Sequence, residues 1–250
     1  MNLPGDEVLL GLFLVFARVG TCLMLLPGFS AAQIVPRLRL FVAFAVTLAV
    51  FPLVQPQIQT AGITADPSGL FAKIAAEMVT GAAFALPIRF LLGAISFMGE
   101  TVMQLIGLNP IPGVVMEEGQ GSTVLSAFFS TAAIVLFFTL GLHANAILAV
   151  AASYRIVPLG EFADMTGVMV RLRDGLSDAF ITVLRLSAPF LIYAIAINFV
   201  SGVVNKLTPQ IPVYFVATPF LIAGGAVLLY WIGDDILALF TAALAQAIGS

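Results

Sequence analysis

Three stretches of this chain contain no Asp, Glu, Lys or Arg over more than the roughly 20 residues that a helix needs to cross a bilayer core. They are residues 40–65, 119–154 and 207–233. Each stretch is apolar on all sides, whereas a transmembrane β-barrel has segments of about 10 residues in which apolar and polar residues alternate. The runs therefore predict an all-α integral membrane protein with several spanning helices, and they argue against a barrel.

The composition supports the same class of protein. Hydrophobic residues make up 61% of the chain and charged residues 9%, against roughly half and about a quarter in soluble globular chains. The first apolar stretch follows Asp6 and Glu7 and contains Arg18, so we expect it to remain as the first helix and not to be a cleaved secretory signal.

The remaining elements follow from the apolar stretches and the breaks between them. We expect a first helix within 8–29, a turn at Pro36, a second helix over 40–54, and a loop from Pro52 and Pro56 to residue 68. A third region, with Pro87 inside, is one kinked helix or two short ones. Later elements are a loop over 107–121, an apolar stretch over 122–152, a charged segment over 155–178, helices over 179–204 and 213–232, and a short final helix.

Charged residues inside the apolar stretches need partners. Arg18 lies about ten residues into the first stretch, where an unpaired charge costs several kcal/mol, so it requires a carboxylate or a position facing water. A structural ion pair is the favoured interpretation, and a role in lining a conduit is the other. Lys73 and Glu77 are one helical turn apart, so we expect them to pair. That interpretation is preferred to a proton relay through Glu77, Arg89 and Glu100.

The sequence gives no sign of catalysis, of a metal or of another cofactor. His143 is the only histidine and Cys22 the only cysteine, so a metal site has no ligand set and an intrachain disulfide is impossible. Asp234 and Asp235 lack a second aspartate in another apolar stretch, as an intramembrane aspartyl protease would require. Glu117 and Glu118, which suggest a membrane prenyl-protein protease, lack its downstream arginine. We therefore expect a protein that is not an enzyme.

The basic residues do not set an orientation in the membrane. With six alternating crossings, Arg37, Arg39 and Lys206 fall on one side, while the other side receives Lys73, Arg155, Arg171 and Arg173. Small residues four apart, such as Gly81 and Ala85, allow helices to approach closely. Weak charge bias, broken apolar runs and scattered charges together suggest surfaces buried against other subunits.

Two strings of residues stand near the two ends of the chain. The N-terminal string is Phe16-Ala17-Arg18-Val19-Gly20, followed by Pro27 and Pro36. The C-terminal string is followed by Pro219 and Gly224-Gly225, and it reads Asn205-Lys206-Leu207-Thr208-Pro209-Gln210-Ile211-Pro212-Val213-Tyr214-Phe215. These strings resemble the FliR family of flagellar export proteins and its injectisome counterpart SctT. Their order along the chain makes the resemblance fairly specific, and it leans toward a flagellar system.

The resemblance implies a subunit of the inner-membrane export gate at the flagellar basal body. Its partners would be FliP-like and FliQ-like subunits, FlhB-like and FlhA-like export components, and unfolded export substrates. It also implies a FliP-like region over 1–178 and a FliQ-like hairpin with a C-terminal helix over 179–250.

Two segments are predicted to be functional. The resemblance implies that a loop over 107–121 helps to plug the closed pore; its residues are Gly107, Asn109, Pro110, Pro112, Gly113, Met116, Glu117, Glu118 and Gly119. We expect the elbow of the C-terminal hairpin to pack in the assembly; its residues are Lys206, Thr208, Pro209, Gln210 and Pro212. The alternative functions are a secondary transporter of a small solute, which would need inverted repeats, and a purely structural membrane scaffold.

Overall fold

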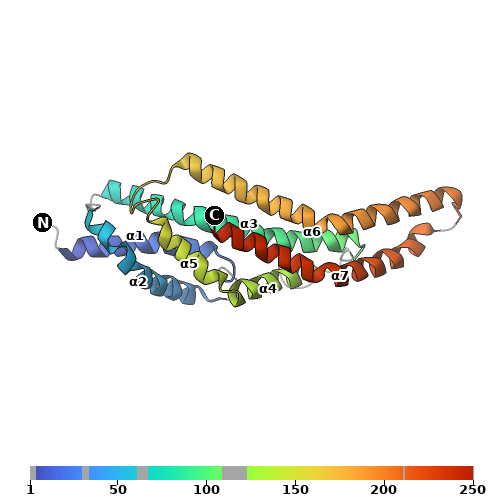
Figure 1. The fold of residues 1–250 in the computed structure, drawn as a ribbon, viewed down its shortest axis with the longest axis horizontal. Helices are drawn as coiled ribbons and strands as arrows, with labels where there is room; N and C mark the ends of the chain where they lie inside the picture. Colours follow the sequence, from blue (N-terminus) through green and yellow to red (C-terminus); the bar gives the residue numbers. More distant parts are fainter. Residues whose placement is uncertain (1–3, 30–33, 61–66, 109–122, 211, 250) are drawn as a thin grey trace. The chain divides into compact units, whose positions relative to one another are not determined.

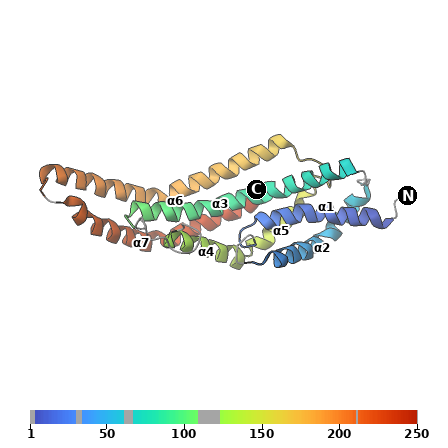
Figure 2. The same ribbon diagram turned by 180° about the vertical axis from the view of Figure 1, so that it is seen from behind.

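The protein is built from helices. The computed structural model describes residues 4–29, 34–60, 67–108, 123–210 and 212–249. Over these ranges there are seven α-helices and no β-strand, which confirms the all-α prediction (Figures 1 and 2). The helices are α1 (Pro4–Leu25), α2 (Pro36–Thr60), α3 (Pro67–Leu105), α4 (Val124–Thr139), α5 (Leu142–Ser153), α6 (Met165–Leu207) and α7 (Val213–Gly249).

Most of these helices can cross a membrane. Among the described residues, α1, α2, α3, α6 and α7 are long and apolar enough to do so. The helices α4 and α5 meet at a bend of 66° and count as a sixth span if they cross together. Gly141 lies between them with a φ of 70°, a left-handed conformation that glycine adopts without strain. The chain is therefore a multi-pass membrane protein, as its apolar runs predict.

The chain divides into two compact units. Unit 1 comprises Met1–Phe90, Phe137–Ser177 and Leu244–Ser250, and unit 2 comprises Leu91–Leu136 and Asp178–Ala243. Within unit 1, α1 packs against α2 and α5, and α2 packs against α5. Side chains that share this core are fully or almost fully buried, among them Leu14, Val15, Leu26, Ala43, Val54 and Val150.

Unit 2 contains a helical hairpin made by α6 and α7, with the elbow at its tip (Figures 1 and 2). The phenol of Tyr193 on α6 donates a hydrogen bond of 2.5 Å to the carbonyl oxygen of Phe220 on α7. A Cβ atom at Gly224 would overlap this phenol, so the glycine makes room for the contact. A second polar contact joins Ser96 on α3 to Ser130 on α4, with 2.6 Å between the hydroxyl oxygens.

Several prolines that were predicted to lie in turns or loops are part of helices. Pro36 is the first residue of α2, a position where its missing N–H is not needed, so the turn predicted there is wrong. Pro52 and Pro56 lie inside α2, which continues to Thr60 instead of ending near residue 54. Each proline removes one helical hydrogen bond, whereas a loop in apolar surroundings would leave several backbone groups unpaired. For the same reason α3 runs through Pro87 as one helix.

The last two helices are longer than predicted. The helix α6 begins at Met165, because the Asp164 carboxylate accepts hydrogen bonds from the backbone N–H groups of Thr166 and Gly167 and caps the helix. The helix α7 runs through Asp234 and Asp235 to Gly249, so the separate final helix predicted after them is wrong. In the last part of α7, side chains spaced four residues apart are buried along one face of the helix: Ile236, Phe240, Leu244 and Ile248.

Candidate functional site

The most polar buried feature of unit 1 is a cluster centred on Arg18 of α1. The guanidinium group forms an ion pair with Glu77 of α3, with 2.6 Å between Nε and Oε2, and both side chains are 0% exposed. Its second bond to Glu77 runs from an Nη atom to Oε1 over 3.0 Å. The pair is therefore bidentate, which is the strongest geometry for a guanidinium and a carboxylate.

Every N–H group of Arg18 has an acceptor. Two bonds go to Glu77, one of 3.0 Å goes to the Ser153 hydroxyl at the end of α5, and two of 3.1 Å go to the carbonyl oxygen of Val157. These bonds use all five guanidinium donors. The guanidinium carbon also lies 3.9 Å from the centre of the Tyr154 ring, a cation–π contact. Burial raises the pKa of the Tyr154 phenol, so this ring stays uncharged beside the cation.

The carboxylate of Glu77 is held from a second direction. The backbone N–H of Gly160 donates a bond of 2.7 Å to Oε1 of Glu77. Gly160 has a φ of 79°, which favours glycine, and lies in the turn over 158–161. The predicted pair between Lys73 and Glu77 is therefore wrong. Arg18 approaches Glu77 in bidentate geometry, while Lys73 places its aliphatic carbons beside Gly160.

Close helix packing accompanies this ion pair. A Cβ atom at Gly81 of α3 would overlap the backbone carbonyl of Arg18 on α1. Glu77 and Gly81 are one turn apart on α3, so the same face supplies the counter-ion and the space for α1. The predicted close approach at Gly81 is thus confirmed. Arg18, Glu77, Ser153 and Gly160 together join α1, α3, the end of α5 and the segment before α6 within unit 1.

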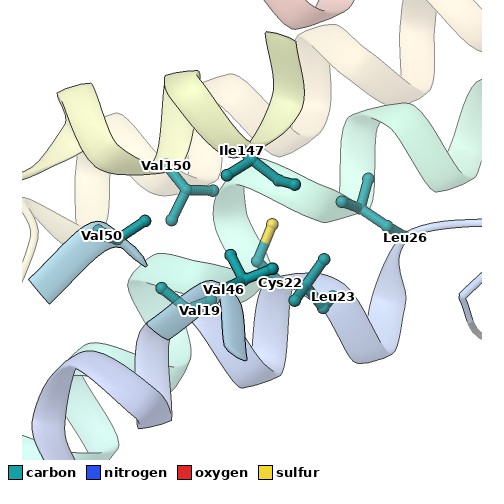
Figure 3. A pocket seen from close by; sticks show the side chains of 8 residues that line it. All are labelled: Val19, Cys22, Leu23, Leu26, Val46, Val50, Ile147 and Val150. Atoms are coloured by element: carbon teal, nitrogen blue, oxygen red, sulfur yellow. The ribbon is translucent and has the colours of Figure 1, made fainter. Parts of the chain in front are cut away.

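A small cavity beside α1 contains no polar side chain that could recognise a ligand (Figure 3). The thiol of Cys22 lies among aliphatic side chains from α1, α2 and α5, as Figure 3 shows. The lining residues are Val19, Cys22, Leu23, Leu26, Val46, Val50, Ile147 and Val150. His143 lies against the rings of Phe137 and Phe138, where α4 and α5 meet. Within the described ranges no group of three His, Cys, Asp or Glu side chains is arranged to hold a metal ion.

At the start of the predicted plug loop, α3 ends in a standard C-terminal helix cap. Gly107 has a φ of 77°, its N–H bonds to the carbonyl of Gln104, and the N–H of Leu108 bonds to the carbonyl of Met103. This pattern is a Schellman motif, in which a left-handed glycine satisfies the last helical carbonyls. The other predicted loop residues lie outside the described residues: Asn109, Pro110, Pro112, Gly113, Met116, Glu117, Glu118 and Gly119.

The predicted elbow lies at the surface of unit 2. The backbone N–H and the hydroxyl of Thr208 both bond to the carbonyl of Val204, which closes α6 just after Lys206. The remaining elbow residues that the structure describes are exposed, namely Pro209, Gln210 and Pro212. The elbow side chains are thus accessible for contact.

Sequence reasoning found Arg18 but missed most of its partners. Ser153, Tyr154, Val157 and Gly160 are far from Arg18 in the sequence and are brought to it only by tertiary packing. One local signal was available, because Pro158 and Gly160 together indicate a tight turn at this point. Every residue has a backbone carbonyl, so the sequence does not indicate that the carbonyl of Val157 accepts these hydrogen bonds.

Comparison with known proteins gives consistent matches along nearly the whole chain. A family model described as "Bacterial export proteins, family 1" matches residues 9–247. This match includes Arg18, the loop over 107–121 and the elbow.

Three similar relatives are each named flagellar biosynthetic protein FliR. The protein of Caulobacter vibrioides is 27% identical over 217 residues, which cover 86% of this chain and 85% of that protein. The protein of Aquifex aeolicus is 25% identical over 236 residues, with coverage of 91% and 87%. The protein of Escherichia coli is 21% identical over 213 residues, with coverage of 83% and 78%.

Proposed function

The chain belongs to the bacterial export proteins, family 1, and on that premise we propose that it is a subunit of the flagellar type III protein-export gate. The observation that carries the proposal is the family match over 9–247, together with relatives of nearly the same length that are named for flagellar biosynthesis. The several spanning helices fit a multi-pass inner-membrane protein at the flagellar base. The family is a structural part of a secretion apparatus, and its role here is that of a channel component.

The proposed partners are FliP-like and FliQ-like subunits in one hetero-oligomer, with FlhB-like and FlhA-like components and unfolded export substrates. The chain leaves large apolar side chains exposed along α6, which supports a partner that covers this helix. Examples are Phe180, Leu184, Ile192, Ile195 and Phe199. Surfaces of this kind on a helical chain are covered by lipid or by other subunits. Within this proposal, residues 1–178 correspond to a FliP-like part and residues 179–250 to a FliQ-like part.

The loop over 107–121 is proposed to close the channel. Its sequence combines glycines and prolines with Val114, Val115 and Met116, so it can seal by apolar packing and still be displaced without breaking a helix. The cap at Gly107 supports this role, because it ends α3 firmly before the loop begins. Passage of a substrate would then move the loop and leave α3 intact.

The elbow is proposed to pack in the assembly. Its polar side chains Lys206, Thr208 and Gln210 are exposed, so they are accessible to another subunit. The energy for export would come from the proton-motive force and from a separate ATPase, because this chain is proposed to act as a passive part of the gate.

A secretion assay tests the function. A bacterial strain that lacks only this chain should release no flagellar export substrates into the medium, and the full-length chain supplied from a plasmid should restore their release. Immunoblots of the medium and of the cells measure the exported and the retained substrate. Normal export in the strain without the chain would contradict the proposal.

A further inference from the structure

The first half of α7 carries a long apolar stripe that the chain itself leaves exposed. Five side chains spaced by one to seven residues share one broad face of the helix. They are Val216 (55% exposed), Phe220 (65%), Val227 (47%), Tyr230 (85%) and Trp231 (72%). We call these five residues the α7 stripe. In the most apolar 18-residue segment of α7, only 6% of the segment is buried inside the chain, which is the lowest share among the five candidate membrane spans.

Aromatic residues with a polar group lie near both ends of the part of α7 that carries this stripe. Tyr214, which is 64% exposed, lies next to the elbow, and Tyr230 and Trp231 lie at the other end. They are separated by about 16 residues, or roughly 25 Å of helix, which is close to the thickness of a bilayer core. Tyrosine and tryptophan gather at the two membrane interfaces, where the ring is apolar and the polar group meets water.

Charged residues mark the same two limits. Along α7, the next charges beyond Trp231 are Asp234 and Asp235, and the nearest charge before Tyr214 is Lys206 at the elbow. Between these limits α7 has no charged or amide side chain, and the hydroxyl of Thr218 bonds back to the carbonyl of Tyr214. Between the aromatic residues at its two ends, no side chain of this stretch needs a hydrogen-bond partner from another protein.

The neighbouring helix of the hairpin also exposes large apolar side chains, but amide side chains interrupt them. Over about the same length α6 exposes Ile192, Ile195 and Phe199 together with the amides of Asn198 and Asn205. An amide suits a hydrogen bond to another helix better than contact with hydrocarbon. The stretch of α7 between Tyr214 and Trp231 has no such group.

We propose that the α7 stripe contacts lipid acyl chains directly, with Tyr214 at one interface of the bilayer and Tyr230 and Trp231 at the other. This inference rests on the inner-membrane location in the proposed function and adds to it which surface contacts lipid. It places the bilayer on residues 214–231 of α7.

Trp231 is the only tryptophan of the chain, so its fluorescence reports on one position. The full-length chain is reconstituted in phosphatidylcholine vesicles whose acyl chains are brominated either near the headgroup or near the methyl end. Trp231 should lose more fluorescence to the shallow bromine than to the deep one. The double variant Trp231→Phe with Phe220→Trp should show the reverse order, and Trp231→Phe with Tyr214→Trp should again favour the shallow bromine.

The same experiment is repeated on the particle that co-purifies with the chain. The signal of Trp231 is the difference between that particle and one carrying Trp231→Phe, which removes any contribution from tryptophans of partner subunits. Quenching by bromolipid in the particle supports the proposal. If Trp231 is shielded from both bromolipids there, a protein partner covers the stripe, and if aqueous iodide quenches it best, the stripe faces water.

Either of those two results overturns the proposal. Neither bears on the export function, because co-purification with export components and secretion of substrates are measured separately. A variant that does not reach the folded state is recognised by its elution in the void volume on size-exclusion chromatography. The wild-type signal alone still decides whether lipid reaches Trp231.

Discussion

At the scale of single residues, one buried cation organises unit 1. The sequence predicts that Arg18 needs a carboxylate or water, because an unpaired charge in an apolar helix is too costly. The structure supplies Glu77, together with Ser153 and the Val157 carbonyl. The identity of the carboxylate was not predictable, because Lys73 offered Glu77 a local partner and the bidentate approach of Arg18 depends on tertiary packing.

Removing the carboxylate should destabilise the folded chain. In Glu77→Ala the Arg18 charge remains buried with no counter-ion, and the cost of breaking a buried pair in this way is about 3–5 kcal/mol. Thermal unfolding of the detergent-solubilised chain, followed by circular dichroism of its helices, should shift to markedly lower temperature.

The control for that variant is Arg173→Ala. Arg173 forms an ion pair with Asp174 over 2.7 Å, but their side chains are 75% and 55% exposed. Exposed pairs contribute little, so the unfolding temperature of this variant should stay near that of the wild type. Equal unfolding temperatures for Glu77→Ala and the wild type would show that the cluster does not stabilise unit 1.

At the scale of elements, the apolar runs predicted where helices lie but not where they end. Pro52 and Pro56 were expected to lie in a loop, yet α2 continues through both of them to Thr60. At Pro87 one kinked helix and two short ones were both open, and α3 is one helix. Asp234 and Asp235 were expected to separate two helices, yet α7 is continuous. Residue preferences describe a helix in water, whereas in apolar surroundings unpaired backbone groups cost more than one lost hydrogen bond.

Two glycines of α3 test the packing of α3 against α1. Gly81→Ala places a methyl group against the Arg18 carbonyl, so α1 and α3 must separate, at a cost of about 1–3 kcal/mol. Gly93→Ala lies on the same helix with no atom within 4 Å of the new Cβ, so it should be neutral or slightly stabilising. The unfolding temperatures of the two variants should therefore change in opposite directions or by clearly different amounts, and matching losses would refute the close contact.

The loop over 107–121 gives a prediction about the channel. Deleting residues 113–119 should make the inner membrane leaky to small ions, because the proposed seal of apolar side chains is removed. The measurement is ion conductance of cells or of the reconstituted complex, with a Gly-Ser segment of equal length as a second variant. If conductance stays at the wild-type level in both variants, the loop is not a plug.

The elbow gives a prediction about assembly. Gln210 is exposed at the tip of the hairpin, so Gln210→Ala should leave the fold unchanged and lower the yield of intact complex. The matched control is Gln246→Ala, an exposed glutamine near the end of α7 that is distant from the elbow. Complex yields after affinity purification are compared by size-exclusion chromatography. The same yield from both variants would remove the elbow from the interface.

At the scale of the whole molecule, the chain exposes more apolar surface than a protein in water could. Large apolar side chains such as Phe71, Leu207 and Phe215 are at least three-quarters exposed. The apolar runs and the charges without local partners predicted that much apolar surface would be exposed on this chain. The sequence also predicted the family that the comparisons show. It could not assign each surface to lipid or to a subunit, because that depends on chains other than this one.

The most direct test of the export-gate account is co-purification. The tagged chain is expressed in its native host, extracted in a mild detergent and purified, and the proteins recovered with it are identified by mass spectrometry. Recovery with FliP-like and FliQ-like chains in one large particle is the predicted result. Recovery as a lone monomer or a homodimer would contradict the account and favour a secondary transporter.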